Sequence, residues 1–175
     1  SQDQVWAACG GLNTIEFLQN GEIVVKPIIM DEEKLRGFEG KFMLFFTGIS
    51  RFASQIAEEQ IQNTNKNKPE LHRMKELVDE AQKLLIAASR NGGDFTQFGK
   101  LLNETWHLKR SLSTKISSSE IDGMYETAIK NGAVGGKLLG AGGGGFVLFY
   151  VEPENQTRVR ESLKGYLHIP FKFYF

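Results

Sequence analysis

A run of glycines late in the chain limits what the surrounding segment can form. Residues 135–150 read GGKLLGAGGGGFVLFY, and Gly142 to Gly145 are consecutive. Because glycine has no Cβ atom, it adopts positive φ readily and lets other groups approach its backbone closely. Such a run can turn successive N–H groups inward to hold an anion, or it can form a bulge or tight turn before a buried strand. One turn needs only one or two glycines, so we favour the anion-binding interpretation.

The dinucleotide fingerprint of Rossmann folds is formally present in this run. Gly140, Gly142 and Gly145 have the spacing G-x-G-x-x-G. That fingerprint requires a strand before it and a helix after it. Here a predicted helix ends at Gly132 and a predicted strand begins near Phe146, which is the reverse order. A Rossmann site is therefore not expected.

The P-loop of nucleotide-hydrolysing proteins is the second candidate. Gly136 and Lys137 stand as an adjacent Gly-Lys pair. The motif requires a serine or threonine next, where this chain has Leu138, and a glycine five positions before Gly136, where it has Asn131. Neither nucleotide-binding loop explains the run.

Composition narrows the class of partner. The 175 residues are about one domain. Basic and acidic residues both number 21, so a broad basic surface for nucleic acid is not expected and a small-molecule partner is favoured. Because Cys9 is the only cysteine, an intramolecular disulfide and a multi-cysteine zinc site are excluded, which fits a reducing cytoplasm. The three histidines show no metal-ligand spacing, so no metal site is predicted.

Hydrophobic patterning predicts the elements of one α+β domain over residues 1–175. Apolar runs predict strands at 10–17 and 22–30, joined at Asn20-Gly21, which is a strong hairpin signal. Helical spacing then predicts a block of helices, and no apolar run is long enough to cross a membrane. The full set of predicted elements is strands at 10–17, 22–30, 41–48, 146–152 and 170–175, and helices at 49–61, 69–90, 95–112, 117–131 and 153–165. Strands in hairpins and helices in a block favour a two-layer fold, with a mostly antiparallel sheet covered by helices on one face.

Four stretches of the chain resemble one family. KLLGAGGGGF, at residues 137–146, resembles the third, C-terminal signature of the GHMP small-molecule kinases. SQDQVWAACGGLNTIEF at 1–17, FFTGISRFAS at 45–54 and WHLKRSLSTKIS at 106–117 are similar to the branch that acts on bacterial heptose 7-phosphate. The resemblance extends over most of the chain.

The resemblance implies a domain organisation. Members have an N-terminal domain whose glycine- and serine-rich loop wraps ATP and contributes magnesium contacts, and a C-terminal domain of ferredoxin-like build, with the active site between them. This sequence has no P-x-x-x-G-L-G-S-S-A stretch. We therefore expect the chain to be the C-terminal domain without its N-terminal partner, cut from something larger, and by itself inactive.

Asp3 is the residue to which the resemblance assigns catalysis. In the family, an aspartate just before a Gly-Gly strand lies near the acceptor hydroxyl, and QDQVWAACGG matches that pattern. A carboxylate there would orient or deprotonate the sugar hydroxyl. Without the resemblance, Asp3 would be read as an acid at the first turn of a helix.

The remaining candidate residues would bind phosphate or substrate. Arg51, at a predicted helix start, could take the substrate's own phosphate or form a surface ion pair. Lys109, Arg110 and Lys115 crowd a predicted helix end, where complementing the helix dipole is the commoner role. Lys137 either borders the glycine loop or helps to neutralise phosphate. The assignment is Gly140, Ala141, Gly142, Gly143 and Gly144 for nucleotide or phosphate, and Thr47, Arg51, Lys115 and Lys137 for substrate.

The implied function is a cytoplasmic, ATP-dependent and magnesium-requiring sugar kinase. It would phosphorylate the anomeric hydroxyl of D-glycero-D-manno-heptose 7-phosphate and so supply heptose for cell-surface polysaccharides. Another sugar 1-kinase of the fucose type is the alternative within the enzymes. A stand-alone domain that binds a phosphosugar or a protein and catalyses nothing is the alternative outside them. The oligomeric state stays open.

Overall fold

A computed structural model of the chain describes residues 2–49, 53–91 and 94–173. The helices are α1 (Gln2–Cys9), α2 (Glu32–Glu39), α3 (Ala53–Gln62), α4 (Lys68–Asn91), α5 (Thr96–Ser111), α6 (Ser119–Lys130) and α7 (Pro153–Ser162). The strands are β1 (Asn13–Phe17), β2 (Ile23–Pro27), β3 (Phe42–Phe46), β4 (Ala133–Leu138), β5 (Phe146–Val151) and β6 (Leu167–Ile169). This is the predicted α+β domain.

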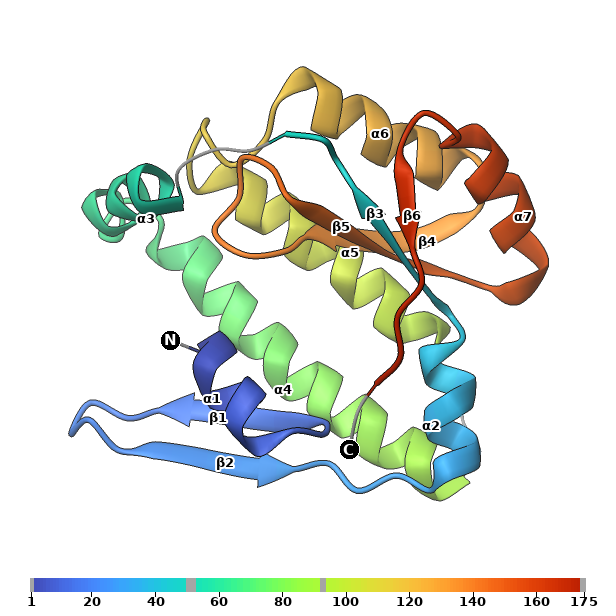
Figure 1. The fold of residues 1–175 in the computed structure, drawn as a ribbon. Coiled ribbons are helices and arrows are strands. Elements are labelled where there is room, and N and C mark those ends of the chain that lie inside the picture. Colours follow the sequence, from blue (N-terminus) through green and yellow to red (C-terminus); the bar gives the residue numbers. More distant parts are fainter. Residues whose placement is uncertain (1, 50–52, 92–93, 174–175) are drawn as a thin grey trace.

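A four-stranded antiparallel sheet forms the centre of the molecule (Figure 1). The strands lie in the order β4-β5-β3-β6. The two central strands, β3 and β5, pair with each other although they lie far apart in the sequence. Phe45 lies opposite Val147, and Leu138 lies opposite Val147 from the other side. The apolar sequences of β3 and β5 suit these central positions, because central strands are buried on both faces.

Helices cover the sheet from two sides (Figure 1). Phe149 and Tyr150 are successive residues of β5, so their side chains point to opposite faces, and both are fully buried. Phe149 packs in a cluster with Met124 of α6 and Val159 of α7. Tyr150 packs in a second cluster with Phe95, just before α5. Coverage is therefore wider than the one face that the sequence indicated, because α5 also lies against β4 and β5.

The first segment of the chain stands apart from the central sheet (Figure 1). β1 and β2 form a separate two-stranded antiparallel sheet, with Phe17 opposite Ile23. The turn between them contains Asn20 and Gly21, and Gly21 has φ 87°. This confirms the predicted hairpin. Helix α1 precedes it and is missing from the set of predicted elements, although the alternative interpretation of Asp3 as an acid in the first turn of a helix describes its position.

Two further elements are absent from the predicted set, because their sequence signals are weak. Helix α2 is capped by Asp31, whose Oδ1 accepts the N–H of Lys34 at 3.0 Å. Strand β4 contains Gly135 and Gly136, which strand propensity disfavours. A Cβ on Gly135 would lie 2.0 Å from the carbonyl oxygen of Gly99, so this glycine is required for α5 to pack against β4.

Several details of the predicted elements need correction. The last strand is residues 167–169 and not 170–175, and residues 174 and 175 lie outside the described part. Helix α6 begins at Ser119 and not at residue 117, and the hydroxyl of its N-cap Ser118 accepts the N–H of Ile121. Ile61 of α3 and Val78 of α4 are 73% and 51% exposed, although helical spacing of apolar residues predicted both helices. Apolar spacing alone overestimates burial on helices at the edge of a fold.

Among the described residues, no helix is both long and apolar enough to cross a membrane.

Candidate functional site

The glycine run forms the loop between β4 and β5. Because a strand stands on each side of it and no helix follows, the exclusion of a Rossmann site stands, although a strand does precede the loop. Gly142 has φ 121°, and a Cβ there would lie 3.1 Å from the backbone of Ile116. A Cβ on Gly144 would lie 2.4 Å from the carbonyl oxygen of Ile49. The absence of side chains thus lets two other loops pack directly on this one.

Those two neighbouring loops hold the glycine loop by its own N–H groups. Gly143 donates to the carbonyl of Ile116 at 2.8 Å, and Gly145 donates to the carbonyl of Ile49 at 2.9 Å. Gly143 was assigned to phosphate, but its N–H group is already used inside the protein. Any anion held by the backbone of this loop must be held by other N–H groups.

Thr47, assigned to substrate, also belongs to this internal bonding. Its side chain is 7% exposed, and its hydroxyl donates to the carbonyl of Gly145 at 2.9 Å and accepts from the N–H of Ile49 at 3.2 Å. The Thr47 N–H donates to the same Gly145 carbonyl at 2.8 Å. In this structure Thr47 joins the end of β3 to the end of the glycine loop.

Lys109 holds the other end of the loop. It lies in the last turn of α5 and its side chain reaches the end of β4. Its Nζ donates to the carbonyl of Gly140 at 2.6 Å and to the carbonyl of Leu138 at 3.1 Å. The residue is 8% exposed, which is unusual for a lysine. From the sequence, the expected role of Lys109 is to complement the helix dipole. Its contact with the glycine loop is visible only in the tertiary structure.

Lys137 and Asp3 share the electrostatic environment of Lys109. Burial, together with the neighbouring Lys137 ammonium, lowers the pKa of Lys109 to about 8, and the Asp3 carboxylate offsets part of this change. Burial lowers the pKa of Lys137 as well, and Asp3 again opposes the change. Asp3 itself is exposed in the first turn of α1. The fold therefore places two lysines at the start of the glycine loop, within electrostatic range of the Asp3 carboxylate.

The other predicted substrate residues are placed differently. Lys115 forms an ion pair with Glu59 of α3 at 3.0 Å, which lowers the pKa of the Glu59 carboxyl. Arg51 lies outside the described residues. Ala141 contributes its carbonyl, which accepts from the side-chain amide of Gln60 at 3.1 Å. The contact of Gln60 with the loop was not predicted, because a polar residue on a helix carries no sequence signal that distinguishes it from other surface residues.

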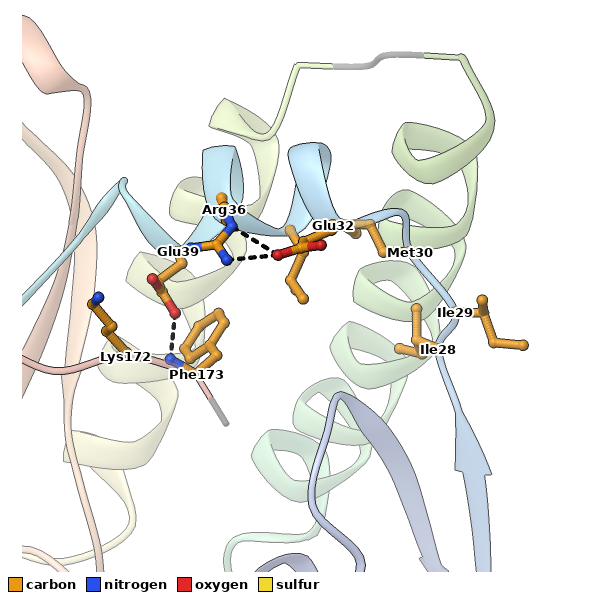
Figure 2. Close-up of a pocket in the computed structure, with 9 residues that line it drawn as sticks. Ile28, Ile29, Met30, Glu32, Arg36, Glu39, Lys172 and Phe173 are labelled. Carbon is orange, nitrogen blue, oxygen red and sulfur yellow. Dashed lines mark hydrogen bonds and ion pairs between the residues drawn. The ribbon is translucent and has the colours of Figure 1, made fainter. Parts of the chain in front are cut away.

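A separate pocket of about 590 Å³ lies between the end of β2, α2 and the C-terminal segment (Figure 2). Its charged groups are largely paired with each other: Arg36 bonds Glu32, and Glu39 accepts the backbone N–H of Phe173. None of the candidate residues lines it. The lining residues are Ile28, Ile29, Met30, Glu32, Leu35, Arg36, Glu39, Lys172 and Phe173.

Within the described part of the chain, no three histidine, cysteine, aspartate or glutamate side chains gather as metal ligands. Asp3 is the acid that acts electrostatically on both Lys109 and Lys137. One carboxylate does not make a metal site by itself. Magnesium in phosphoryl transfer is commonly held by one or two carboxylates together with the substrate phosphates.

Comparison with known proteins decides the family. Residues 81–169, just over half of the chain, match the family described as GHMP kinases C terminal. The chain belongs to the GHMP kinases. The match includes Lys109, Lys137 and the whole glycine loop, and members of this family use ATP and Mg²⁺.

Individual relatives agree with this family. D-glycero-alpha-D-manno-heptose 7-phosphate kinase of Campylobacter jejuni is 33% identical over 164 residues, covering 94% of this chain and 48% of that protein. A crystal structure of a D-glycero-D-manno-heptose 1-phosphate kinase from Bacteroides thetaiotaomicron superposes with a TM-score of 0.68 at 28% identity, covering 98% of this chain and 45% of that one. L-fucokinase/L-fucose-1-P guanylyltransferase of Bacteroides fragilis is 30% identical over 69% of this chain and 13% of its own length. This GHMP kinase chain spans about half the length of the first two relatives.

Proposed function

We propose that the whole protein containing this chain is an ATP-dependent kinase that phosphorylates the anomeric hydroxyl of D-glycero-D-manno-heptose 7-phosphate. The observations that carry the proposal are that Lys109 bonds the carbonyl of Gly140 at the start of the glycine loop, and that the Asp3 carboxylate acts electrostatically on both Lys109 and Lys137. A carboxylate beside two ammonium groups suits a reaction that removes a proton and moves a negatively charged group. The similarity to the heptose 7-phosphate kinase over 94% of this chain supports the choice of sugar.

The reaction assigns one role to each part of this site. The anomeric oxygen attacks the γ-phosphorus of ATP, the bond from that phosphorus to the β–γ bridging oxygen breaks, and ADP leaves. Asp3 accepts the proton of the sugar hydroxyl and orients that hydroxyl before transfer. Lys137 offsets negative charge on the transferred group, because a partly buried ammonium interacts more strongly with an anion than an exposed one does. The glycine loop lies beside the phosphate.

ATP and Mg²⁺ are the cosubstrate and the metal of this proposal. Mg²⁺ would neutralise charge on the ATP phosphates when bound, and the family resemblance puts most of its contacts on the N-terminal domain and not on residues of this chain. The loop backbone would supply the N–H groups of Gly140, Ala141, Gly142 and Gly144. We assign Gly143 a structural role instead, since its N–H group bonds Ile116.

A fucose-type sugar 1-kinase is the second candidate. The observation that favours it is the similarity of this chain to the Bacteroides fragilis fucokinase over 69% of its length. Both candidates use the same transfer to an anomeric hydroxyl, so the catalytic residues would be shared. They differ in whether the site must accept a second phosphate on the sugar. Arg51 and Lys115 are our candidates for that second phosphate.

The cellular role follows from the sugar. A kinase for heptose 7-phosphate would work in the cytoplasm, where ATP is supplied, and would feed the synthesis of cell-surface polysaccharide. Partners other than ATP and the sugar phosphate are not required by the proposal.

The proposal is tested by coupled ADP release from the whole protein. Heptose 7-phosphate, fucose, galactose and mevalonate are offered separately with ATP and Mg²⁺, and the 175-residue chain alone is assayed in parallel. We expect turnover with heptose 7-phosphate from the whole protein and none from the chain alone. Selective turnover of fucose would replace the first candidate by the second, and absence of turnover with all four compounds would reject both.

A further inference from the structure

Lys109 is the charged side chain that anchors the glycine loop in the described structure. The other anchors described above are neutral: the backbone bonds of Gly143 and Gly145, the hydroxyl and N–H of Thr47 on the Gly145 carbonyl, and the side-chain amide of Gln60. Lys109 instead places an ammonium group under the start of the loop, where it bonds Leu138 and Gly140. Hydrogen bonds from an ionised donor are shorter and stronger than neutral ones.

The position of Lys109 in the fold requires partners for its charge. A buried ammonium group is unfavourable unless its donors are bonded. Two of its three donors go to the carbonyls of Leu138 and Gly140, at 3.1 and 2.6 Å. The charged groups that act on it among the described residues are Lys137 from β4 and Asp3 from α1. The same ammonium therefore bonds the loop and interacts electrostatically with the carboxylate of Asp3.

We propose that Lys109 is the positioning residue of this site: its ammonium fixes the start of the glycine loop in the orientation that phosphoryl transfer requires. The kinetic part of this inference rests on the proposed function, whereas the anchoring of the loop does not. Lys109 does not contact the reacting atoms in this assignment. It acts through the backbone of Gly140, because displacing a loop beside a reacting phosphate by a fraction of an ångström slows transfer.

The charge on Lys109 gives the role a characteristic pH dependence. Burial and Lys137 lower its pKa to about 8. Above that pH the ammonium loses its proton, and the bonds to Leu138 and Gly140 become weaker, neutral bonds. Arginine in the same place stays charged throughout. A decline in kcat through pH 8 that disappears in Lys109→Arg therefore separates a positioning role from simple packing.

Two variants and a control test the anchoring without any substrate. Hydrogen exchange by mass spectrometry follows residues 139–145 in the whole protein for Lys109→Met, Lys109→Arg and Lys100→Met, the last removing an exposed lysine from the same helix. We expect Lys109→Met to speed exchange of the loop by roughly tenfold, Lys109→Arg to restore part of the protection, and Lys100→Met to have no effect. Loop exchange that is unchanged in Lys109→Met would overturn the anchoring.

Kinetics test the consequence for transfer. We expect Lys109→Met to lower kcat by roughly 10²-fold while KM for ATP and sugar changes much less. Unchanged kcat together with faster loop exchange would overturn the positioning role. If Lys109→Met unfolds the protein, the pH profile of Lys109→Arg decides: a decline through pH 8 in both proteins contradicts the inference. Absence of turnover in the wild type would reject the proposed function and leave the exchange experiment to decide the anchoring.

Discussion

The N–H of Gly143 donates to the carbonyl of Ile116 at 2.8 Å, and this bond fixes the middle of the glycine loop to the segment that follows α5. The same segment lies so close to Gly142 that a Cβ there would be 3.1 Å from its backbone. Part of the glycine run therefore serves packing inside the protein. The remaining N–H groups are what the loop can offer to a phosphate.

Replacing Gly142 should disturb the loop more than replacing Gly140. Both have positive φ, at 121° and 70°, but a Cβ on Gly140 meets nothing within 4 Å whereas one on Gly142 meets Ile116. We expect Gly140→Ala to lower the free energy of unfolding by about 1–2 kcal/mol from backbone strain alone. Gly142→Val should lower it by about 1–3 kcal/mol more from overpacking, measured by chemical denaturation. Equal losses in the two variants would contradict the close packing on Ile116.

Gly135 should be intolerant of any side chain. Its Cβ would lie 2.0 Å from the carbonyl oxygen of Gly99, so Gly135→Ala must push α5 away from β4. We expect a loss of roughly 3 kcal/mol or more in the free energy of unfolding, at the upper end for overpacked cores. Gly123→Ala on α6 is the matched control, because nothing lies within 4 Å of a Cβ there and alanine favours a helix. A Gly135→Ala protein as stable as Gly123→Ala would show that α5 and β4 are not in contact.

Asp3→Asn tests the catalytic carboxylate. In the whole protein we expect kcat to fall by roughly 10²–10⁴-fold, the usual contribution of a general base, with KM for the sugar changed much less. Asp79→Asn, which neutralises an exposed acid on α4, should leave both constants unchanged. Weaker sugar binding with kcat intact would remove Asp3 from proton transfer.

The structure also explains which parts of the fold were predictable. The hairpin at Asn20-Gly21 and the helices α3 to α7 have strong local signals, in turn residues and in apolar spacing. Strand β4 was concealed, because Gly135 admits α5 and Gly136 admits Leu148 and Phe149 of β5, and neither residue favours a strand. Such a requirement belongs to a tertiary contact, and no local pattern expresses it.

The candidate site was predictable to a similar, partial extent. The anion-binding role of the glycine loop was predicted from its composition, and the catalytic role of Asp3 from resemblance to a family. In the fold, Asp3 acts electrostatically on Lys109, whose ammonium bonds the carbonyl of Gly140. Lys109 was missed because a lysine at a helix end has an ordinary explanation in the helix dipole. Its burial and its bond to Gly140 arise from residues 31 positions apart.

Lys109 predicts a dependence of stability on pH with a definite sign. Its pKa in the folded chain is about 8, below the ordinary 10.5, so the folded chain binds fewer protons than the unfolded chain between these values. The unfavourable buried charge is fully present below pH 8 and is relieved as the pH rises toward 10.5. We expect the free energy of unfolding of the wild type, minus that of Lys109→Met, to increase over this range by at most about 1.4 kcal/mol per pH unit. A difference that stays constant or decreases would show that Lys109 is not buried as a charge.

The most direct test of the central claim is to identify the product by ³¹P NMR. The whole protein is incubated with ATP, Mg²⁺ and D-glycero-D-manno-heptose 7-phosphate, and the phosphorus signals of the sugar are followed with time. The account predicts a second sugar phosphate signal, coupled to the anomeric proton, that appears at the rate of ADP formation and is absent with Asp3→Asn. No new sugar phosphate, or a phosphate on any other hydroxyl, would contradict it.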